Sequence, residues 1–345
     1  MGRYVGGILK AVVKAPAGAT NVSEATGVWS IKEAVQFRGS NNWPDGVLNP
    51  DFRVNTTHAW IGKGFNNSRN RQIDVKSFDS NADATDWGDT TYSASARGNG
   101  TISDGTIGYI YGGFYCCGAS DKRDINKITF ATQGNLVDIG DLAGGAVHCT
   151  GHMSATKGFV SGGRYSSYYN SVHSRTITDT GSWTDYGDLS DVIYEGCAMG
   201  TRTTMIVCKV SQSSRTNNID QVDMTSAGNA TNWGDMLAET NQASAGGCDT
   251  VGIIHMRDNG GGNDAIKLDK LSFASAGNAT SFGDRISSQS EGGVCGDDVR
   301  VIMYGGNTGG YQDQISTLTY ASGGTSTDYG DTDDPHNGDG GISHN

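Results

Sequence analysis

A large apolar residue followed by Gly-Asp occurs six times along this chain of 345 residues. Successive glycines of this motif are 52, 47, 47, 49 and 47 residues apart. Two copies end a longer repeat, Gly-Asn-Ala-Thr-x-aromatic-Gly-Asp, at 228–235 and 277–284. A period of about fifty residues indicates stacked copies of one supersecondary unit. The six copies are Trp87-Gly88-Asp89, Ile139-Gly140-Asp141, Tyr186-Gly187-Asp188, Trp233-Gly234-Asp235, Phe282-Gly283-Asp284 and Tyr329-Gly330-Asp331.

Each repeat also carries a pattern typical of strands. An aliphatic residue stands 15 positions before every Gly-Asp glycine, and a second apolar residue follows five positions later. Such short alternating runs predict a strand, the Gly-, Asn- and Ser-rich stretch after it predicts a turn, and the Gly-Asp run predicts an outer strand. An earlier apolar run closes with Gly-Gly at 112–113, 162–163 and 305–306. The aliphatic residues are Ile73, Ile125, Val172, Ile219, Leu268 and Ile315.

A unit of four short strands cannot bury both of its faces alone, whereas six such units arranged radially can. The sequence therefore predicts an all-β fold, a six-bladed β-propeller with four antiparallel strands per blade. We expect blades at about 46–90, 91–142, 143–189, 190–236, 237–285 and 286–332. An N-terminal arm (1–45) and a C-terminal tail (333–345) flank this ring.

The two faces of such a propeller differ in loop length. The turn between the third and fourth strands has one length in all six repeats, whereas the loops between the second and third strands and between blades vary. Variable loops on a rigid scaffold favour binding, and Tyr among Ser, Gly and Asn suits protein and glycan contacts. The alternative is that these aromatic residues pack the loops together. The candidate binding residues are Phe114, Tyr115, Tyr165, Tyr168, Tyr169 and Tyr311.

Composition excludes several classes of protein. The chain has 52 Gly and 4 Pro, which fits an all-β fold with many tight turns, and its net charge of -12 argues against nucleic-acid binding. The apolar run 5–13 is interrupted by Lys10 and is too short for a signal peptide or for membrane insertion. We therefore expect synthesis in a cytoplasm.

The seven cysteines predict neither a disulfide framework nor a metal site. Cys149, Cys197, Cys248 and Cys295 occur once per repeat without CxxC spacing, so we expect free, buried thiols. The Gly-Asp aspartates lie on separate blades and cannot converge on one cation. We expect their carboxylates to accept backbone N–H groups in turns, and we expect no metal and no cofactor.

No motif of a known catalytic site stands out. A nucleophile elbow, a phosphate loop and a dinucleotide fingerprint are all missing from the sequence. The run 178–183 loosely resembles the aspartate box of sialidases but occurs once. We therefore expect a protein without catalytic residues. A glycan-cleaving enzyme stays an alternative, because carboxylates from different blades can meet in space.

The apolar runs closed by Gly-Gly, each followed by an aromatic residue near the end of the last strand, resemble kelch-type β-propellers. The resemblance covers about residues 46–332. Repeats one, four and five depart from it because they lack the glycine pair.

The Gly-Asn-Ala-Thr-x-aromatic-Gly-Asp repeats resemble those of structural proteins of tailed bacteriophages, especially marine ones. The segment 27–44, with Val28, Trp29 and Trp43, is similar to a segment of phage tail and fibre proteins. Together these resemblances imply a virion protein of the tail fibre, tail tip or head fibre. The arm would join other virion proteins, although it can also be read as a plug or lid on the ring.

The same resemblance implies partners. We expect a homo-oligomer within the particle that displays its propeller toward a host-surface glycan or protein. The alternatives are a purely structural propeller that bridges virion proteins, and a depolymerase that degrades host glycan.

Overall fold

The computed structural model describes residues 58–62, 71–90, 96–97, 100–103, 107–112, 114–115, 123–130, 132–142, 148–164, 167–176, 183–210, 216–240, 242–258, 266–337 and 341–342. The chain divides into two compact units, Met1–Asn55 and Thr56–Asn345, and every described residue belongs to the second. The predicted arm, with Val28, Trp29 and Trp43, lies outside the described residues.

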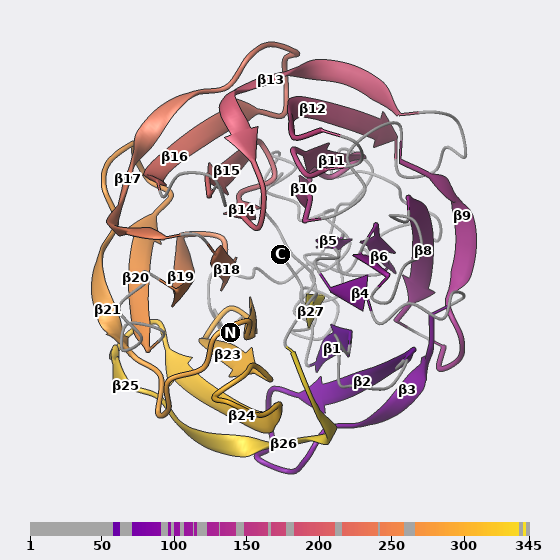
Figure 1. The fold of residues 1–345 in the computed structure, drawn as a ribbon, viewed down its shortest axis with the longest axis vertical. Helices are drawn as coiled ribbons and strands as arrows, with labels where there is room; N and C mark the ends of the chain where they lie inside the picture. Colours follow the sequence, from indigo (N-terminus) through magenta and orange to yellow (C-terminus); the bar gives the residue numbers. More distant parts are fainter. Residues whose placement is uncertain are drawn as a thin grey trace, which may run out of the picture. The chain divides into compact units, whose positions relative to one another are not determined.

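The second unit is a six-bladed β-propeller, which confirms the predicted fold (Figure 1). Each blade is a sheet of four antiparallel strands, which follow one another from the axis to the rim. From inner to outer edge, blade one contains β27 (Gly341–Ile342), β1 (His58–Gly62), β2 (Gln72–Ser77) and β3 (Thr85–Asp89). Blade two contains β5 (Gly100–Ser103), β6 (Ile107–Tyr111), β8 (Asp124–Thr129) and β9 (Val137–Asp141). Blade three contains β10 (Thr150–Met153), β11 (Lys157–Ser161), β12 (Tyr169–Thr176) and β13 (Thr184–Ile193).

The other three blades repeat this order. Blade four contains β14 (Cys197–Gly200), β15 (Thr204–Cys208), β16 (Thr216–Asp223) and β17 (Thr231–Thr240). Blade five contains β18 (Gln242–Gly247), β19 (Val251–Asp258), β20 (Lys267–Ser272) and β21 (Thr280–Asp284), with the short parallel β25 (Gly324–Thr325) at its edge. Blade six contains β22 (Gly293–Gly296), β23 (Arg300–Tyr304), β24 (Gln312–Thr319) and β26 (Thr327–His336).

The C-terminal segment closes the ring, which corrects the predicted tail 333–345. β26 continues to His336, and β27 pairs with β1 through Trp60 opposite Ile342 and Ile61 opposite Gly341. Blade one therefore combines three strands from the start of the ring with one strand from its end. Two residues carry no recognisable alternation, so the sequence pattern did not predict this strand.

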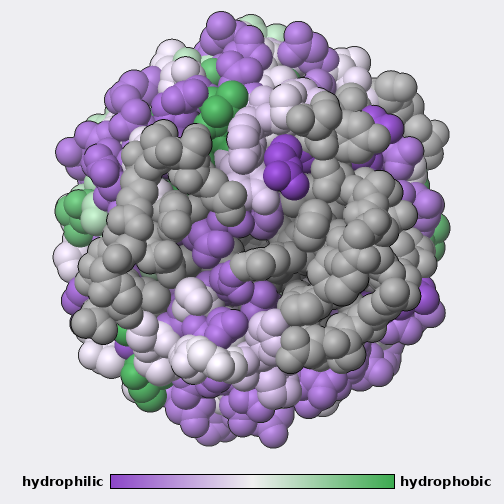
Figure 2. All heavy atoms as spheres, in the orientation of Figure 1, coloured by the Kyte–Doolittle hydropathy of each residue, from purple (hydrophilic) through white to green (hydrophobic). Residues whose placement is uncertain are grey.

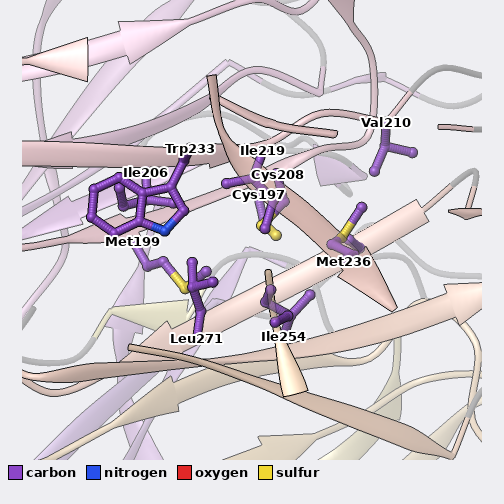
Figure 3. Packing of buried hydrophobic residues seen from close by; sticks show 12 residues of the cluster. Cys197, Met199, Ile206, Cys208, Val210, Ile219, Trp233, Met236, Ile254 and Leu271 are labelled. Carbon is purple, nitrogen blue, oxygen red and sulfur yellow. The ribbon is translucent and has the colours of Figure 1, made fainter. Parts of the chain in front are cut away.

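The core lies between neighbouring blades. The six aliphatic residues that recur 15 positions before the Gly-Asp glycine all lie in third strands and are at most 1% exposed. Figure 3 shows the layer between blades four and five, where Ile219 of β16 and Ile254 of β19 approach from opposite sheets. Each blade thus buries both faces against its neighbours, as the repeat pattern predicted.

A β-bulge directs the aromatic side chain of the Gly-Asp motif toward the next blade. In blade three, Val172 pairs with Gly187 while His173 pairs with Asp185, so Tyr186 is the extra residue. The Tyr186 hydroxyl donates to the carbonyl of Asp223 in blade four at 2.9 Å. Trp87, Trp233 and Phe282 are the extra residues of the same bulge in blades one, four and five. A bulge turns a side chain away from the regular alternation, and here it turns the aromatic ring into the next blade.

The longer repeat joins blades through backbone hydrogen bonds. The N–H of Asp188 donates to Asn229 Oδ1 at 3.1 Å, and the N–H of Ala230 donates to the Asp188 carbonyl at 2.8 Å. The same two bonds link Asp235 to Asn278 and Ala279 at 3.0 and 2.8 Å. The aspartate of the motif therefore acts through its backbone.

This finding corrects the prediction that the motif aspartates accept N–H groups through their carboxylates. The accepting carboxylate belongs instead to the residue two positions before the glycine. Asp138 accepts from the N–H of Gly140 at 2.9 Å, and Asp185 accepts from the N–H of Gly187 at 3.2 Å. That carboxylate stabilises the bulge within its own blade.

Buried carboxylates form a second link between blades. Asp269 of blade five accepts the N–H of Leu237 in blade four at 2.9 Å, and Asp220 of blade four accepts the N–H of Ser190 in blade three at 2.8 Å. Asp220 also faces Lys209 at 3.3 Å. Lys209 stands where the first glycine of the Gly-Gly pair stands in other blades, so the departure of repeat four from the kelch-type pattern places a cation beside Asp220.

Asp269 predicts a pH-dependent stability. Burial raises the pKa of Asp269 to about 6, against the lowering effect of the hydrogen bond from Leu237. Because folding raises this pKa, the contribution of Asp269 to the stability of the folded state is most favourable below about pH 4. That contribution is lost as pH rises through 6. We expect Asp269→Asn to raise the free energy of unfolding at pH 7.5 by about 1–2 kcal/mol relative to the unmodified chain.

The measurement is urea unfolding of both proteins from pH 4 to pH 7.5. The difference between them is expected to grow with pH, because the amide accepts from Leu237 without becoming charged. Asn126 occupies the equivalent buried position in blade two and shows that an amide fits there. A variant that is less stable than the parent at pH 7.5 would contradict the prediction.

Candidate functional site

The structure describes the side chains of three of the six candidate binding residues, Tyr168, Tyr169 and Tyr311. Phe114 and Tyr115 form β7 (Phe114–Tyr115), which pairs with β4 (Ala96–Arg97), and their side chains lie outside the described part of the chain. Tyr165 also lies outside it. Tyr168 and Tyr169 belong to blade three, whereas Tyr311 bridges to Asn307 in blade six. The two blades stand on opposite sides of the ring, so Tyr311 does not share a site with Tyr168 and Tyr169 (Figure 1).

Tyr168 belongs to a compact group of side chains between blades three and four. Its ring meets the ring of Tyr194 edge-on, with centroids 5.4 Å apart. The guanidinium of Arg164 lies over the Tyr194 ring at 5.5 Å, and the His148 imidazole lies 4.3 Å from the same ring. His148 Nε2 is 3.4 Å from Glu195 Oε1. We call these five residues the blade-three cluster.

A glycine turn and backbone hydrogen bonds position the described residues around Tyr168. Gly162 and Gly163 adopt φ values of 63° and 87°, which let the chain turn at the end of β11. Gly163 donates its N–H to the Ile193 carbonyl at 3.1 Å, and Tyr169 donates its N–H to the Gly163 carbonyl at 3.0 Å. The Gly-Gly pair recognised in the sequence thus ties the end of β11 to Ile193, the last residue of β13.

The residues of the blade-three cluster differ in their exposure to solvent. Tyr194 is 7% exposed, and both members of the His148–Glu195 pair are largely buried. Tyr168 is 40% exposed and is one of the few large apolar side chains that reach solvent. A half-exposed ring supported by a buried ring and a cation is a rigid contact surface.

Three residues near the axis adopt a strained backbone. His148, Glu195 and Glu291 have φ values of 54°, 69° and 59°, and each stands two positions before an innermost strand, β10, β14 or β22. Residues other than glycine rarely adopt this conformation, which costs on the order of 1–3 kcal/mol. The Glu195 carbonyl accepts the N–H of Ala243 at 3.1 Å, which fixes that turn against blade five.

Sequence reasoning missed His148, Arg164, Tyr194 and Glu195. The usual signal for a positive φ is glycine, and neither His148 nor Glu195 supplies it. Tyr194 follows directly on a strand end and carried no loop signal of its own. Their contact with Tyr168 depends on how one loop folds over the next connection, which no spacing in the chain encodes.

The described residues also bear on two other kinds of site, a metal centre and a membrane-spanning helix. In the part of the chain that the structure describes, no three His, Cys, Asp or Glu residues gather as metal ligands. None of the described residues forms a helix that could cross a bilayer. In Figure 2, the coloured part of this face is mostly hydrophilic, with only scattered hydrophobic residues.

Comparison with known proteins identifies the fold of this chain. No protein-family model and no curated protein match the chain. Among solved structures, 506 chains match. One, titled "Structure of YjhT", has a TM-score of 0.57 and 10% sequence identity, over 70% of this chain and 86% of that chain. At this identity the likeness shows the fold alone. The kelch-type and bacteriophage resemblances therefore stay predictions.

Proposed function

We propose that this chain is a structural protein of a tailed-bacteriophage particle whose kelch-like propeller recognises a host-surface glycan. The blade-three cluster is the observation that carries the recognition part of the proposal. The bacteriophage part rests on the repeat Gly-Asn-Ala-Thr-x-aromatic-Gly-Asp and on the segment 27–44. Residues 1–45 would join the protein to other virion proteins.

The chemistry of the cluster suits a sugar. The exposed ring of Tyr168 offers a flat apolar face, on which the C–H groups of a pyranose can stack. The guanidinium of Arg164 lies over the ring of Tyr194, which in turn contacts the ring of Tyr168. Arg164 therefore offers N–H donors near the exposed ring. Backbone hydrogen bonds hold Gly163 and Tyr169 in place, so the chain beside Tyr168 loses little conformational entropy when a ligand binds.

We expect Tyr168→Ala to weaken binding of the full-length chain to polysaccharide from the host envelope at least ten-fold. The loss of one central aromatic contact is typically worth about 2 kcal/mol or more. Val299→Ala is the matched control, because Val299 is 54% exposed in the turn between β22 and β23, on the opposite face. Binding is measured by calorimetry, and unchanged far-UV circular dichroism shows that both variants fold.

The result also separates the alternatives. Equal affinity of the two variants would remove the cluster from recognition. No binding by the unmodified chain, combined with its presence in the particle, would favour a propeller that only bridges virion proteins. Release of reducing ends from the polysaccharide during the same incubation would favour the depolymerase.

Location in the particle needs its own experiment. Antibodies against the propeller, coupled to gold, are expected to label purified phage particles in electron micrographs. Mass spectrometry of particles purified by density gradient is expected to contain peptides from the whole chain. Particles free of the protein would overturn the virion assignment without affecting the glycan-binding measurement.

A further inference from the structure

Two cysteines of blade four stand directly opposite each other on neighbouring strands. Cys197 opens β14 and pairs in register with Cys208, the last residue of β15. Both are buried thiols outside any disulfide, 6% and 0% exposed. Figure 3 shows their sulfur atoms side by side in the layer between blades four and five.

Backbone geometry at this pair suits a cross-link. Directly opposed residues of antiparallel strands have Cα atoms about 4.5–5.5 Å apart. Disulfides form between cysteines whose Cα atoms lie about 4.4–6.8 Å apart. A bond between the two sulfurs therefore requires rotation of side chains rather than movement of strands.

In two other blades, a side chain at this pair reaches across to the opposite residue. In blade six the equivalent residues are Gly293 and Tyr304, and a β-carbon on Gly293 would overlap the Tyr304 ring. In blade three they are Thr150 and Ser161, and the Ser161 hydroxyl donates back to the Thr150 carbonyl at 3.5 Å. In blade six, the absence of a side chain on Gly293 leaves room for the Tyr304 ring. The equivalent space in blade four is occupied by the two thiols.

The remaining described cysteines do not stand opposite a second cysteine in the strand register. Cys295 pairs in register with Ile302, and the Cys248 sulfur lies 3.5 Å from the Thr250 hydroxyl. Cys149 precedes β10. Blade four is thus the only described blade in which two thiols face each other.

We propose that Cys197 and Cys208 are a site of oxidative cross-linking, which closes to a disulfide when the folded protein meets an oxidising medium. With glutathione disulfide as oxidant, the Cys197 thiolate attacks one of its sulfurs and releases one glutathione thiolate. The Cys208 thiolate then attacks the Cys197 sulfur and releases the second. The protein loses two protons and two electrons, and glutathione disulfide becomes two glutathiones.

Burial makes this reaction slow rather than impossible. A hydrogen bond with Cys197, together with burial, raises the pKa of Cys208, and only the thiolate reacts. Glutathione disulfide therefore reaches the buried pair only when the hairpin opens transiently, and the reaction is expected to speed up with pH. A protein made in a reducing cytoplasm would fold with the pair open and acquire the bond later.

The test uses the full-length chain with Cys116→Ser and Cys117→Ser, which removes the two cysteines that lie outside the described residues. The protein is equilibrated in buffers of rising glutathione disulfide to glutathione ratio, at pH 7 and pH 8.5. Remaining thiols are then alkylated in denaturant and mapped by mass spectrometry. The expected result is loss of two alkylation sites and a peptide pair joined through Cys197 and Cys208, formed faster at pH 8.5.

Cys248→Ala in the same background is the matched control and is expected to form the same linked peptides. Cys208→Ala is expected to form none, and its Cys197 is expected to be recovered either alkylated or as a mixed disulfide with glutathione. Detection of the linked peptides in the parent protein tests the proposal even if one of these variants fails to fold. Full alkylation of both cysteines in the most oxidising buffer, including after partial unfolding in urea, would overturn the proposal.

Discussion

A chain that ends at Asn337 is expected to lose about 4 kcal/mol or more of stability and to aggregate. Without β27, blade one keeps three strands, and the inner edge of β1 loses its partner at Trp60 and Ile61. These side chains are 5% and 0% exposed, and partial exposure of each costs about 1–3 kcal/mol. The bare edge would also offer unpaired backbone groups to other chains.

The control for this truncation is a chain that ends at Ile342. It removes only residues 343–345 and leaves the pairing of β27 with β1 intact. Thermal unfolding and size-exclusion chromatography compare the two proteins with the full chain. Equal melting temperatures for the two truncated chains would show that β27 does not hold the ring closed.

Gly187→Ala is expected to destabilise the protein by about 3–5 kcal/mol, because it combines backbone strain with overpacking. Gly187 has a φ of 148°, and a β-carbon there would overlap the carbonyl oxygen of Gly228 in the next blade. The Gly228 segment cannot easily move away, because the N–H of Gly228 donates to the carbonyl of Tyr186 at 2.9 Å.

Gly228→Ala is the matched control, because it changes the other side of the same contact. A β-carbon on Gly228 would meet nothing within 4 Å. Its free energy of unfolding is expected to stay within about 1 kcal/mol of the parent. Chemical unfolding of the two variants measures the difference. Comparable losses in both would show that general packing of the turn, rather than the approach of Gly187, limits stability.

Fixed spacings made most of the ring predictable from sequence. Ile73 and its five counterparts mark the third strands, since each must be buried between two blades and cannot shift by one residue. A further signal was present and unused. The residue after Ile219 and after Leu268 is a buried aspartate, at a position that is polar in every repeat.

The site was less predictable because its parts come from different loops. Tyr168 could be proposed from the composition of its loop, whereas Tyr194 became relevant only through an edge-on contact across two connections. His148 and Glu195 carry their strain without glycine, so the chain holds no local sign of it. The closing strand β27 was also hidden, since pairing with β1 depends on the far end of the ring.

The seam in blade one gives the ring a mechanical weak point. Five blades take all their main strands from one continuous stretch of chain, whereas blade one is completed by a strand from the other end. Tension applied to the two ends of the ring would act first on the two residue pairs that join β27 to β1. The disc would then begin to uncoil from blade one, while the other five sheets kept their strands in place.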